Sequence, residues 1–347
     1  MKKPLVRKLL FQGIPLIAVY LIVVGLINVG IIDDYLMATI ATICINIVLA
    51  TSLNLITGFT GQFSLGHAGF MAIGAYTVGV MNQIWDSPVG FLVSLLLGGL
   101  LAALIGVLIG IPTLRLRGDY LAIATLGMAE IIRVVFVNLD DVTNGAAGLT
   151  VTQYMDWTWF FVITVGSVWL LRNFLRSRHG RDAIAVREDE IAAESIGVDT
   201  TKAKVLSFAI GAFFGGIGGG MYASYFYFIK PDLFGFLKSI DILVIVVLGG
   251  LGSLSGSVIA AILLAVISTA LQGFTEVRMI LYALLLVVIM IFRPQGIMGS
   301  RELSMNLFTK WGVGRKGGLT QPAAGGTAPV VTEETDAVPV AEEGEPR

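Results

Sequence analysis

The sequence predicts an all-α, polytopic integral membrane protein, and three observations support this fold class. The chain has 347 residues, of which 56% are hydrophobic and 14% charged, and its mean hydropathy is +0.85. Apolar runs of roughly twenty residues, the length that a helix needs to cross a bilayer, recur along it. Basic residues gather in alternate gaps between these runs. We expect about ten transmembrane helices, or about eight if the shorter runs do not cross.

The apolar windows divide the chain into successive helices. The first follows a basic start that resembles a signal peptide, but it is too long and lacks a convincing cleavage site, so we expect a retained helix. The window near 239–250 is short and runs into the glycine-rich sequence 249–256, which predicts a broken or re-entrant helix. In order, the windows lie near residues 13–32, 36–57, 62–82, 88–111, 119–138, 157–171, 203–229, 239–250, 256–273 and 278–292.

Small and polar residues inside the windows predict how the helices pack. Small residues occur at every fourth position over residues 98–110 and again over 211–219. This spacing places them on one helix face, where they let two backbones approach closely. Asn46 and Asn54 in the second window are interpreted as hydrogen-bonding partners of neighbouring helices.

The charges predict the orientation, because basic residues accumulate in short cytoplasmic loops. On this basis both termini are expected in the cytoplasm. Ten windows also allow two halves of opposite topology, although the two glycine-rich segments then fall on the same side. The basic clusters are Lys2, Lys3, Arg7 and Lys8; Arg115 and Arg117; Arg172, Arg176, Arg178, Arg181 and Arg187; Arg293 and Arg301. The opposite loops carry Asp33, Asp34, Asp86, Asp140, Asp141 and Asp232, with Trp85, Trp157 and Trp159 as interface anchors.

The composition changes near residue 300. Residues 1–300 are expected to form the transmembrane domain, whereas 301–347 are rich in glycine, proline and acidic side chains. Such a segment cannot bury a hydrophobic core, so we expect a disordered acidic cytoplasmic tail. Cys44 is the one cysteine, which excludes an intrachain disulfide.

The longest polar segment between windows predicts a short amphipathic helix over about residues 183–197, on the cytoplasmic side. Ile191, Ala192 and Ile196 supply apolar positions, while Arg187, Glu188, Glu190 and Glu194 are charges that a partner protein could contact. The alternative is an ordinary solvated helix. The sequence has no G-x-x-x-x-G-K-[ST] phosphate loop, so ATP hydrolysis by that route would need another subunit.

Polar residues at membrane depth are the candidates for a passage. Gln62, Ser64 and His67 fall in a glycine-rich stretch where irregular backbone is expected, and they either line a passage or satisfy broken backbone groups. His179 is the one other histidine and lies in a cytoplasmic loop, so a metal site is not expected.

Glu130 and Arg133 are the most deeply placed opposite charges, three residues apart on one predicted helix. They either gate the outer mouth and bind a zwitterion, or neutralise each other against a neighbouring helix.

Across roughly residues 35–300 the chain resembles the LivM-type permeases of branched-chain amino-acid ABC importers, within the LivHM permease family. The resemblance rests on LNLITGFTGQFSLGHAGFMAIGAY (53–76), LRGDYLAIATL (116–126), NGAAGL (144–149), GRDAIAVREDEIAAESIG (180–197, running on to 204), SIDILVIVVLGGLGSLSG (239–256) and RPQGIMG (293–299). The order of these pieces matches the family, and the second and last favour the LivM type over the LivH type.

The resemblance implies a non-catalytic transport subunit in the cell inner (plasma) membrane. It implies a second, LivH-type permease chain, two ATP-binding subunits and an extracytoplasmic solute-binding protein as partners, membrane lipid around them and no nucleic acid. This chain would bind no cofactor, because ATP and magnesium belong to the ATPase subunits. The family's ATPase-coupling helix corresponds to Arg187, Glu188, Glu190, Ala192, Ala193, Glu194 and Gly197, with the glycine as its C-terminal cap.

Two other functions remain open. A urea or short-amide importer would share these motifs, since the binding protein sets most of the selectivity in such systems. An ion-gradient-driven transporter would need an intramembrane carboxylate, for which Glu130 and Asp241 are the candidates. A membrane-embedded enzyme is disfavoured, because paired histidines, clustered carboxylates and a Cys–His couple are missing from the sequence.

Overall fold

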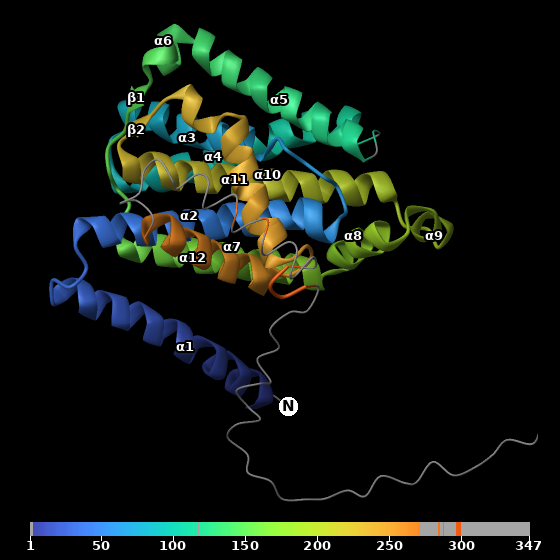
Figure 1. Cartoon of the computed structure of the whole chain (residues 1–347), viewed down its shortest axis with the longest axis horizontal. Coiled ribbons are helices and arrows are strands. Elements are labelled where there is room, and N and C mark those ends of the chain that lie inside the picture. The colour runs from blue at the N-terminus through green and yellow to red at the C-terminus, as the bar shows by residue number, and fades with distance from the viewer. Residues whose placement is uncertain are drawn as a thin grey trace, which may run out of the picture. The chain divides into compact units, whose positions relative to one another are not determined.

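The computed structural model describes residues 3–114, 116, 118–270, 284, 287 and 296–299, with side chains from residue 16 onward. It is almost entirely helical in this part (Figure 1). The long elements are α1 (Lys3–Asn28), α2 (Asp34–Asn54) continued by the π-helix η1 (Leu55–Phe59), α3 (His67–Ile84), α4 (Pro88–Thr113), α5 (Asp119–Asn138), α7 (Trp157–Arg176), α10 (Thr200–Phe226), α11 (Phe236–Gly249) and α12 (Leu254–Ala270). The short ones are α6 (Asp140–Thr143), η2 (Gly145–Ala147), β1 (Leu149–Thr150), α8 (Arg178–Glu188), α9 (Glu190–Ser195), β2 (Phe228–Ile229) and η3 (Pro231–Phe234).

Helix α10 lies at the centre of the bundle and packs against α2, α3 and α4. The glycine-bearing face of α10 packs directly against the backbone of α3. A Cβ on Gly219 would collide with the Met71 carbonyl, and one on Gly74 with the Gly216 carbonyl. The small residues of α4 join this contact, because a Cβ on Gly106 would lie 2.7 Å from the Cβ of Ala212. The predicted packing role of residues 98–110 and 211–219 is therefore confirmed.

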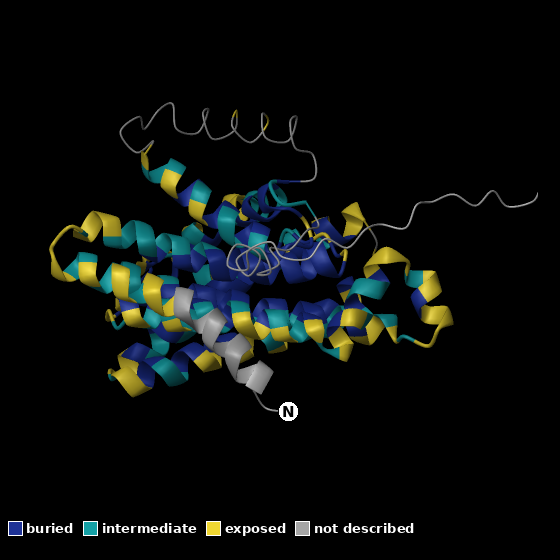
Figure 2. Ribbon diagram, turned by 90° about the horizontal axis from the view of Figure 1, so that it is seen from below, coloured by how far each residue is buried: buried dark blue, intermediate teal, exposed yellow. Residues whose placement is uncertain are grey.

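The outer faces of the long helices are apolar. On α4, Leu100, Leu104 and Leu108 are 58%, 61% and 67% exposed and follow one another at helical spacing. Figure 2 shows exposed residues running along the outer helices around a buried interior. A water-facing helix would carry polar side chains there, so these faces are suited to lipid, and the protein is membrane-embedded.

Nine of the ten predicted windows correspond to helices, and most of the window 278–292 lies outside the described residues. In the part that the structure describes, five helices are long and apolar enough to cross a bilayer: Asp34–Phe59, Pro88–Thr113, Asp119–Asn138, Trp157–Arg176 and Thr200–Phe226. A sixth span would be the pair α11–α12, which bends by 120°. This bend confirms the broken helix predicted at 249–256, whereas the count of ten helices is not confirmed.

The two ends of the bundle differ. At one end β1 pairs with β2 in antiparallel register, Leu149 opposite Ile229. At the other end α8 and α9 project between α7 and α10 (Figure 1). We name α8 and α9 together the arm. Residues 301–347, predicted as an acidic tail, lie outside the described residues.

Candidate functional site

The backbone leaves helical geometry at two places inside the bundle. The first break, residues 60–66, separates η1 from α3, and the second break, residues 250–253, separates α11 from α12. In the first break the Leu65 amide donates to Thr125 Oγ1 of α5 at 3.1 Å. Just beyond it the Ala68 amide donates to Ser239 Oγ of α11 at 3.1 Å. Hydroxyls of neighbouring helices thus satisfy backbone groups that have no helical partner.

Asn54, the last residue of α2, ties this helix to the second break. Its Nδ2 donates to the Ser253 carbonyl at 3.0 Å and to Ser257 Oγ at 2.7 Å, while its Oδ1 accepts the Gly252 amide at 2.9 Å. The backbones also touch, because a Cβ on Gly58 would collide with the Gly252 nitrogen. Asn54 is fully buried, and the prediction that it bonds a neighbouring helix is confirmed.

The three predicted passage residues are buried, with 3%, 1% and 0% exposure for Gln62, Ser64 and His67. His67 Nε2 lies 2.8 Å from Ser52 Oγ, and Ser64 Oγ accepts the Gly66 amide at 3.4 Å. Both polar atoms of the Gln62 amide lack a partner in the described part of the chain, as does His67 Nδ1. Leaving such groups unpaired costs about 1–3 kcal/mol each, so Gln62 has the largest unmet hydrogen-bonding capacity of this set.

Arg187 of the arm lies against both breaks. A Cβ on Gly61 would be 3.3 Å from Arg187 Cγ, and one on Gly252 would be 2.5 Å from its Nη1. Gly252 also has a φ of +85°, so only glycine fits between the arginine and η1. A cavity of about 330 Å³ beside this contact is lined by Arg187, Arg172 and Ile184, among others. Through Arg187 the arm therefore contacts both irregular segments directly.

The arm consists of two helices rather than the single helix predicted over 183–197. The chain is extended at Asp189, whose carboxylate accepts the amides of Ile191 and Ala192 at 2.9 and 3.0 Å. An aspartate that caps a new helix competes with continuation of the old one, which explains the division. Gly197 follows α9 with a φ of +87° and lies in open space, the geometry expected of a C-terminal cap.

The predicted coupling residues divide between the two faces of α9. On the inner face, Glu190 Oε1 pairs with Lys204 Nζ of α10 at 2.6 Å, and Ala193 is buried against Ala203. The outer face presents Ile191 and Ile196, which are 73% and 79% exposed. The remaining predicted residues of the arm, Glu188, Ala192, Glu194 and Gly197, are also exposed. The outer face therefore combines uncovered apolar side chains with carboxylates, as a protein-binding surface does.

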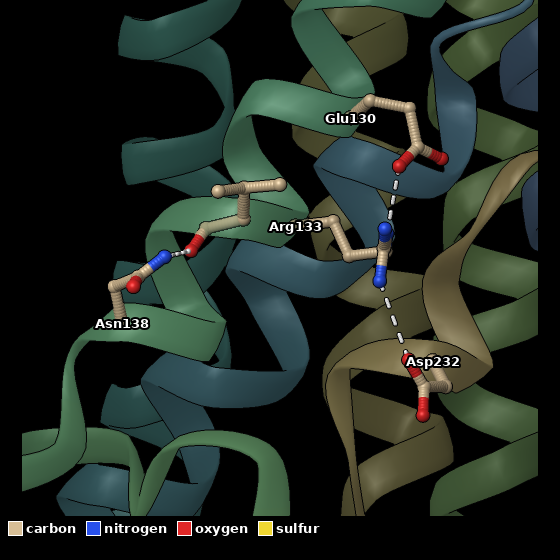
Figure 3. A network of polar contacts seen from close by, with 5 residues as sticks. Glu130, Arg133, Asn138 and Asp232 are labelled. Atoms are coloured by element: carbon tan, nitrogen blue, oxygen red, sulfur yellow. Dashed lines mark hydrogen bonds and ion pairs between the residues drawn. The ribbon is translucent and has the colours of Figure 1, made fainter.

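Glu130 and Arg133 form the predicted ion pair, but a third charge joins it. Arg133 Nε lies 2.7 Å from Glu130 Oε2, and its Nη1 lies 3.3 Å from Asp232 Oδ1 of η3 (Figure 3). The side chains of Arg133, Glu130 and Asp232 are 28%, 36% and 69% exposed, so the network is only partly covered by the protein. It ties α5 to η3, near the strand-bearing end of the bundle.

Sequence reasoning missed several partners in these contacts. Ser52, Asp232 and Lys204 each complete an interaction whose other member was predicted, and they lie 15, 99 and 14 residues away along the chain. For Lys204 a signal existed, because it is a cation at the start of an apolar window beside an acidic segment. No comparable signal in the sequence pointed to Ser52 or Asp232.

The known proteins that the chain resembles are permease components of transport systems. A family model described as "Branched-chain amino acid transport system / permease component" matches residues 35–292. The chain is 37% identical over 289 residues to the high-affinity branched-chain amino acid transport system permease protein LivM of Salmonella typhimurium, which covers 73% of this chain and 68% of that protein. LivM of Escherichia coli K12 is 36% identical with the same coverage. LivH of S. typhimurium is 29% identical over 163 residues, or 46% of this chain and 51% of LivH. No solved structure matches the chain significantly.

Proposed function

The chain belongs to the family of permease components of branched-chain amino acid transport systems, and from this membership we propose that it is the membrane-spanning permease subunit of an ATP-driven importer. The proposed cargo is branched-chain or related hydrophobic amino acids, in keeping with the names of its LivM and LivH relatives. The chain itself carries out no catalysis. Likeness to both relatives supports a heteromeric passage in which a second, LivH-type permease pairs with this one.

The observation that supports this function best is the contact of Arg187 with both breaks. In an importer driven by separate ATPase subunits, movement of those subunits must reach the passage mechanically. The arm combines an uncovered apolar face outside the bundle with a side chain, Arg187, that contacts both irregular segments. We infer that ATPase closure displaces the arm and that Arg187 transmits the displacement to residues 60–66 and 250–253, repacking them between two arrangements.

The remaining parts of the assembly follow from the same reasoning. ATP and Mg²⁺ are held by the ATPase subunits, since this sequence has no phosphate loop. The arm and both termini lie on the cytoplasmic side, where the basic clusters fall. A solute-binding protein delivers the amino acid to the opposite, strand-bearing end. Gln62, with two buried and unpartnered amide atoms, is the passage residue that contacts cargo or its accompanying water.

The test uses the transporter purified with its co-purifying subunits and reconstituted into vesicles that contain ATP. The variant replaces the exposed outer face of α9 by charge, Ile191→Asp with Ile196→Asp. The control, Leu116→Asp, changes an exposed aliphatic residue outside the arm, in the loop between α4 and α5. We expect ATP-dependent leucine and isoleucine uptake, with ATPase subunits and uptake both lost in the arm variant and both kept in the control.

The outcomes separate the alternatives. Uptake that does not require ATP and depends instead on an imposed ion gradient would overturn the assignment as an ATP-driven importer. Preferential uptake of urea or acetamide would replace the proposed cargo while leaving the permease role intact. If the arm variant keeps its ATPase subunits and its uptake, the outer face of α9 is not the coupling surface.

A further inference from the structure

A pocket of about 750 Å³ lies between α1 and the rest of the bundle. This volume is within the range of roughly 300–1,000 Å³ that small-molecule sites occupy. One wall is α1, and the other is formed by the first turns of α2 and α7 and the last turn of α10. We name it the α1 pocket. Its acidic and aromatic lining residues include Tyr20, Asp34, Asp156, Trp157, Tyr225 and Tyr227.

The charge of the α1 pocket is negative. Asp34 and Asp156 line it, and no lysine, arginine or histidine does. Asp156 precedes α7 at the position where an aspartate usually caps a helix, yet its side chain makes no capping bond. Among the described residues neither carboxylate has an ion-pair partner. Two unneutralised carboxylates in one pocket favour a cationic ligand.

The aromatic side chains add a second preference for a cation. Tyr20 and Trp157 lie nearly parallel, with ring centroids 6.4 Å apart and an interplanar angle of 13°. Tyr225 and Tyr227 line the pocket with them. Ring faces attract ammonium groups that lie within about 6 Å of them.

The Tyr20 hydroxyl supplies a hydrogen-bonding group at the surface of the pocket. It lies 3.1 Å from Thr158 Oγ1 and is exposed, so an anionic oxygen of a ligand in the α1 pocket can reach it. Trp157 Nε1 has no partner in the part of the chain that the structure describes, but it is buried and closed to a ligand in the pocket.

The rim of the pocket is held in place by the backbone. Tyr227 has a φ of +60°, an uncommon conformation for a residue with a side chain. Its hydroxyl donates to Gln153 Oε1 at 2.7 Å, and its carbonyl accepts the Val151 amide at 2.7 Å. The tyrosine is therefore fixed across the α1 pocket before any ligand binds.

We propose that the α1 pocket binds the zwitterionic head group of an ethanolamine phospholipid. Asp34 and Asp156 accept hydrogen bonds from its ammonium, the rings of Tyr20, Tyr225 and Tyr227 border that cation, and the Tyr20 hydroxyl donates to the phosphate. Ile17 and Leu21 of α1, 59% and 60% exposed, leave an apolar surface on which an acyl chain can lie. A free amino acid carries the same pairing of ammonium and anionic oxygen, but it would gain nothing from this uncovered apolar surface.

The test uses the full-length chain, with any subunits that co-purify, in lipid nanodiscs. Retention of dioleoyl phosphatidylethanolamine is compared with that of dioleoyl phosphatidylglycerol by native mass spectrometry after partial delipidation. Cation–π and carboxylate contacts together predict a preference of about tenfold for the ethanolamine lipid. Asp34→Asn with Asp156→Asn should abolish the preference, and Tyr20→Phe, which keeps the ring but removes the hydroxyl donor, should weaken it several-fold.

Asp33→Asn is the matched control, because Asp33 neighbours Asp34 but does not line the α1 pocket, and this variant should keep the full preference. Equal retention of the two lipids, or an unchanged preference in both the double variant and Tyr20→Phe, overturns the proposal. Displacement of the bound lipid by millimolar leucine also overturns it, because the site would then serve a soluble zwitterion. Lipid retention is measured without transport, so its failure is separate from failure of the proposed function.

Discussion

Replacement of Asn54 by alanine tests whether one side chain holds the second break against the end of α2 and η1. Asn54 makes three short hydrogen bonds to α12 and the second break, while the close contact of Gly58 with Gly252 leaves no room for a water to substitute. Asn46, two turns earlier on α2, is half-buried and makes no hydrogen bond to a described residue. The two asparagines therefore form a matched pair on one helix.

The magnitude follows from the number and setting of these bonds. Hydrogen bonds between transmembrane helices contribute about 0.6 kcal/mol each on average, so three of them amount to about 2 kcal/mol. Asn54→Ala also leaves the buried Gly252 amide without an acceptor, which costs about 1–3 kcal/mol. We expect the free energy of unfolding to fall by about 2–5 kcal/mol for Asn54→Ala, and by less than about 1 kcal/mol for Asn46→Ala.

The assay is reversible unfolding in mixed micelles by increasing the mole fraction of dodecyl sulfate, with helix content followed by circular dichroism. Uptake by reconstituted transporter is measured on the same preparations. Asn54→Ala should lose both stability and uptake, because the second break is no longer held against η1. Equal unfolding curves for Asn54→Ala and Asn46→Ala would show that the observed hydrogen bonds do not stabilise the breaks.

Two further predictions concern the arm. Lys204→Glu should lower uptake by separating α9 from α10, because the ion pair between Lys204 and Glu190 at 2.6 Å is part-buried. Adding Glu190→Lys reverses the two charges and should restore uptake. Uptake is measured for the single and double variants, and failure of the double variant to recover would argue against the ion pair. Gly197→Asn should keep most of the uptake, because asparagine tolerates a positive φ, whereas Gly197→Val should lose most of it through strain of about 1–2 kcal/mol that displaces α9. Equal uptake by the asparagine and valine variants, at equal insertion, would remove the role assigned to the φ of +87°.

Local patterns accounted for most of the fold. Hydropathy placed nine helices, and the glycine sequence at 249–256 predicted the bend between α11 and α12, because apolar length and helix-breaking residues act within a few turns. The prediction for Asn54 also held, since a buried amide at membrane depth must find a partner on another helix. The same reasoning identified the stretch around Gln62 as irregular.

Predictions that depended on distant partners were less complete. The sequence predicted one helix over 183–197, but the capping carboxylate of Asp189 divides it into two. Glu130 and Arg133 pair as predicted, yet Asp232 joins them from 99 residues away.

The sequence by itself determined that this chain is a helical membrane protein of one permease family, because hydropathy, charge distribution and short motifs are properties of neighbouring residues. Only the tertiary structure decided which irregular segments meet, that Arg187 lies between them, and that Asp34, Asp156 and the aromatic residues around them share one pocket. These contacts depend on how α10 brings the surrounding helices together through its glycine face. Because the packed backbones fix side-chain neighbours across more than a hundred residues, no local pattern could have specified them.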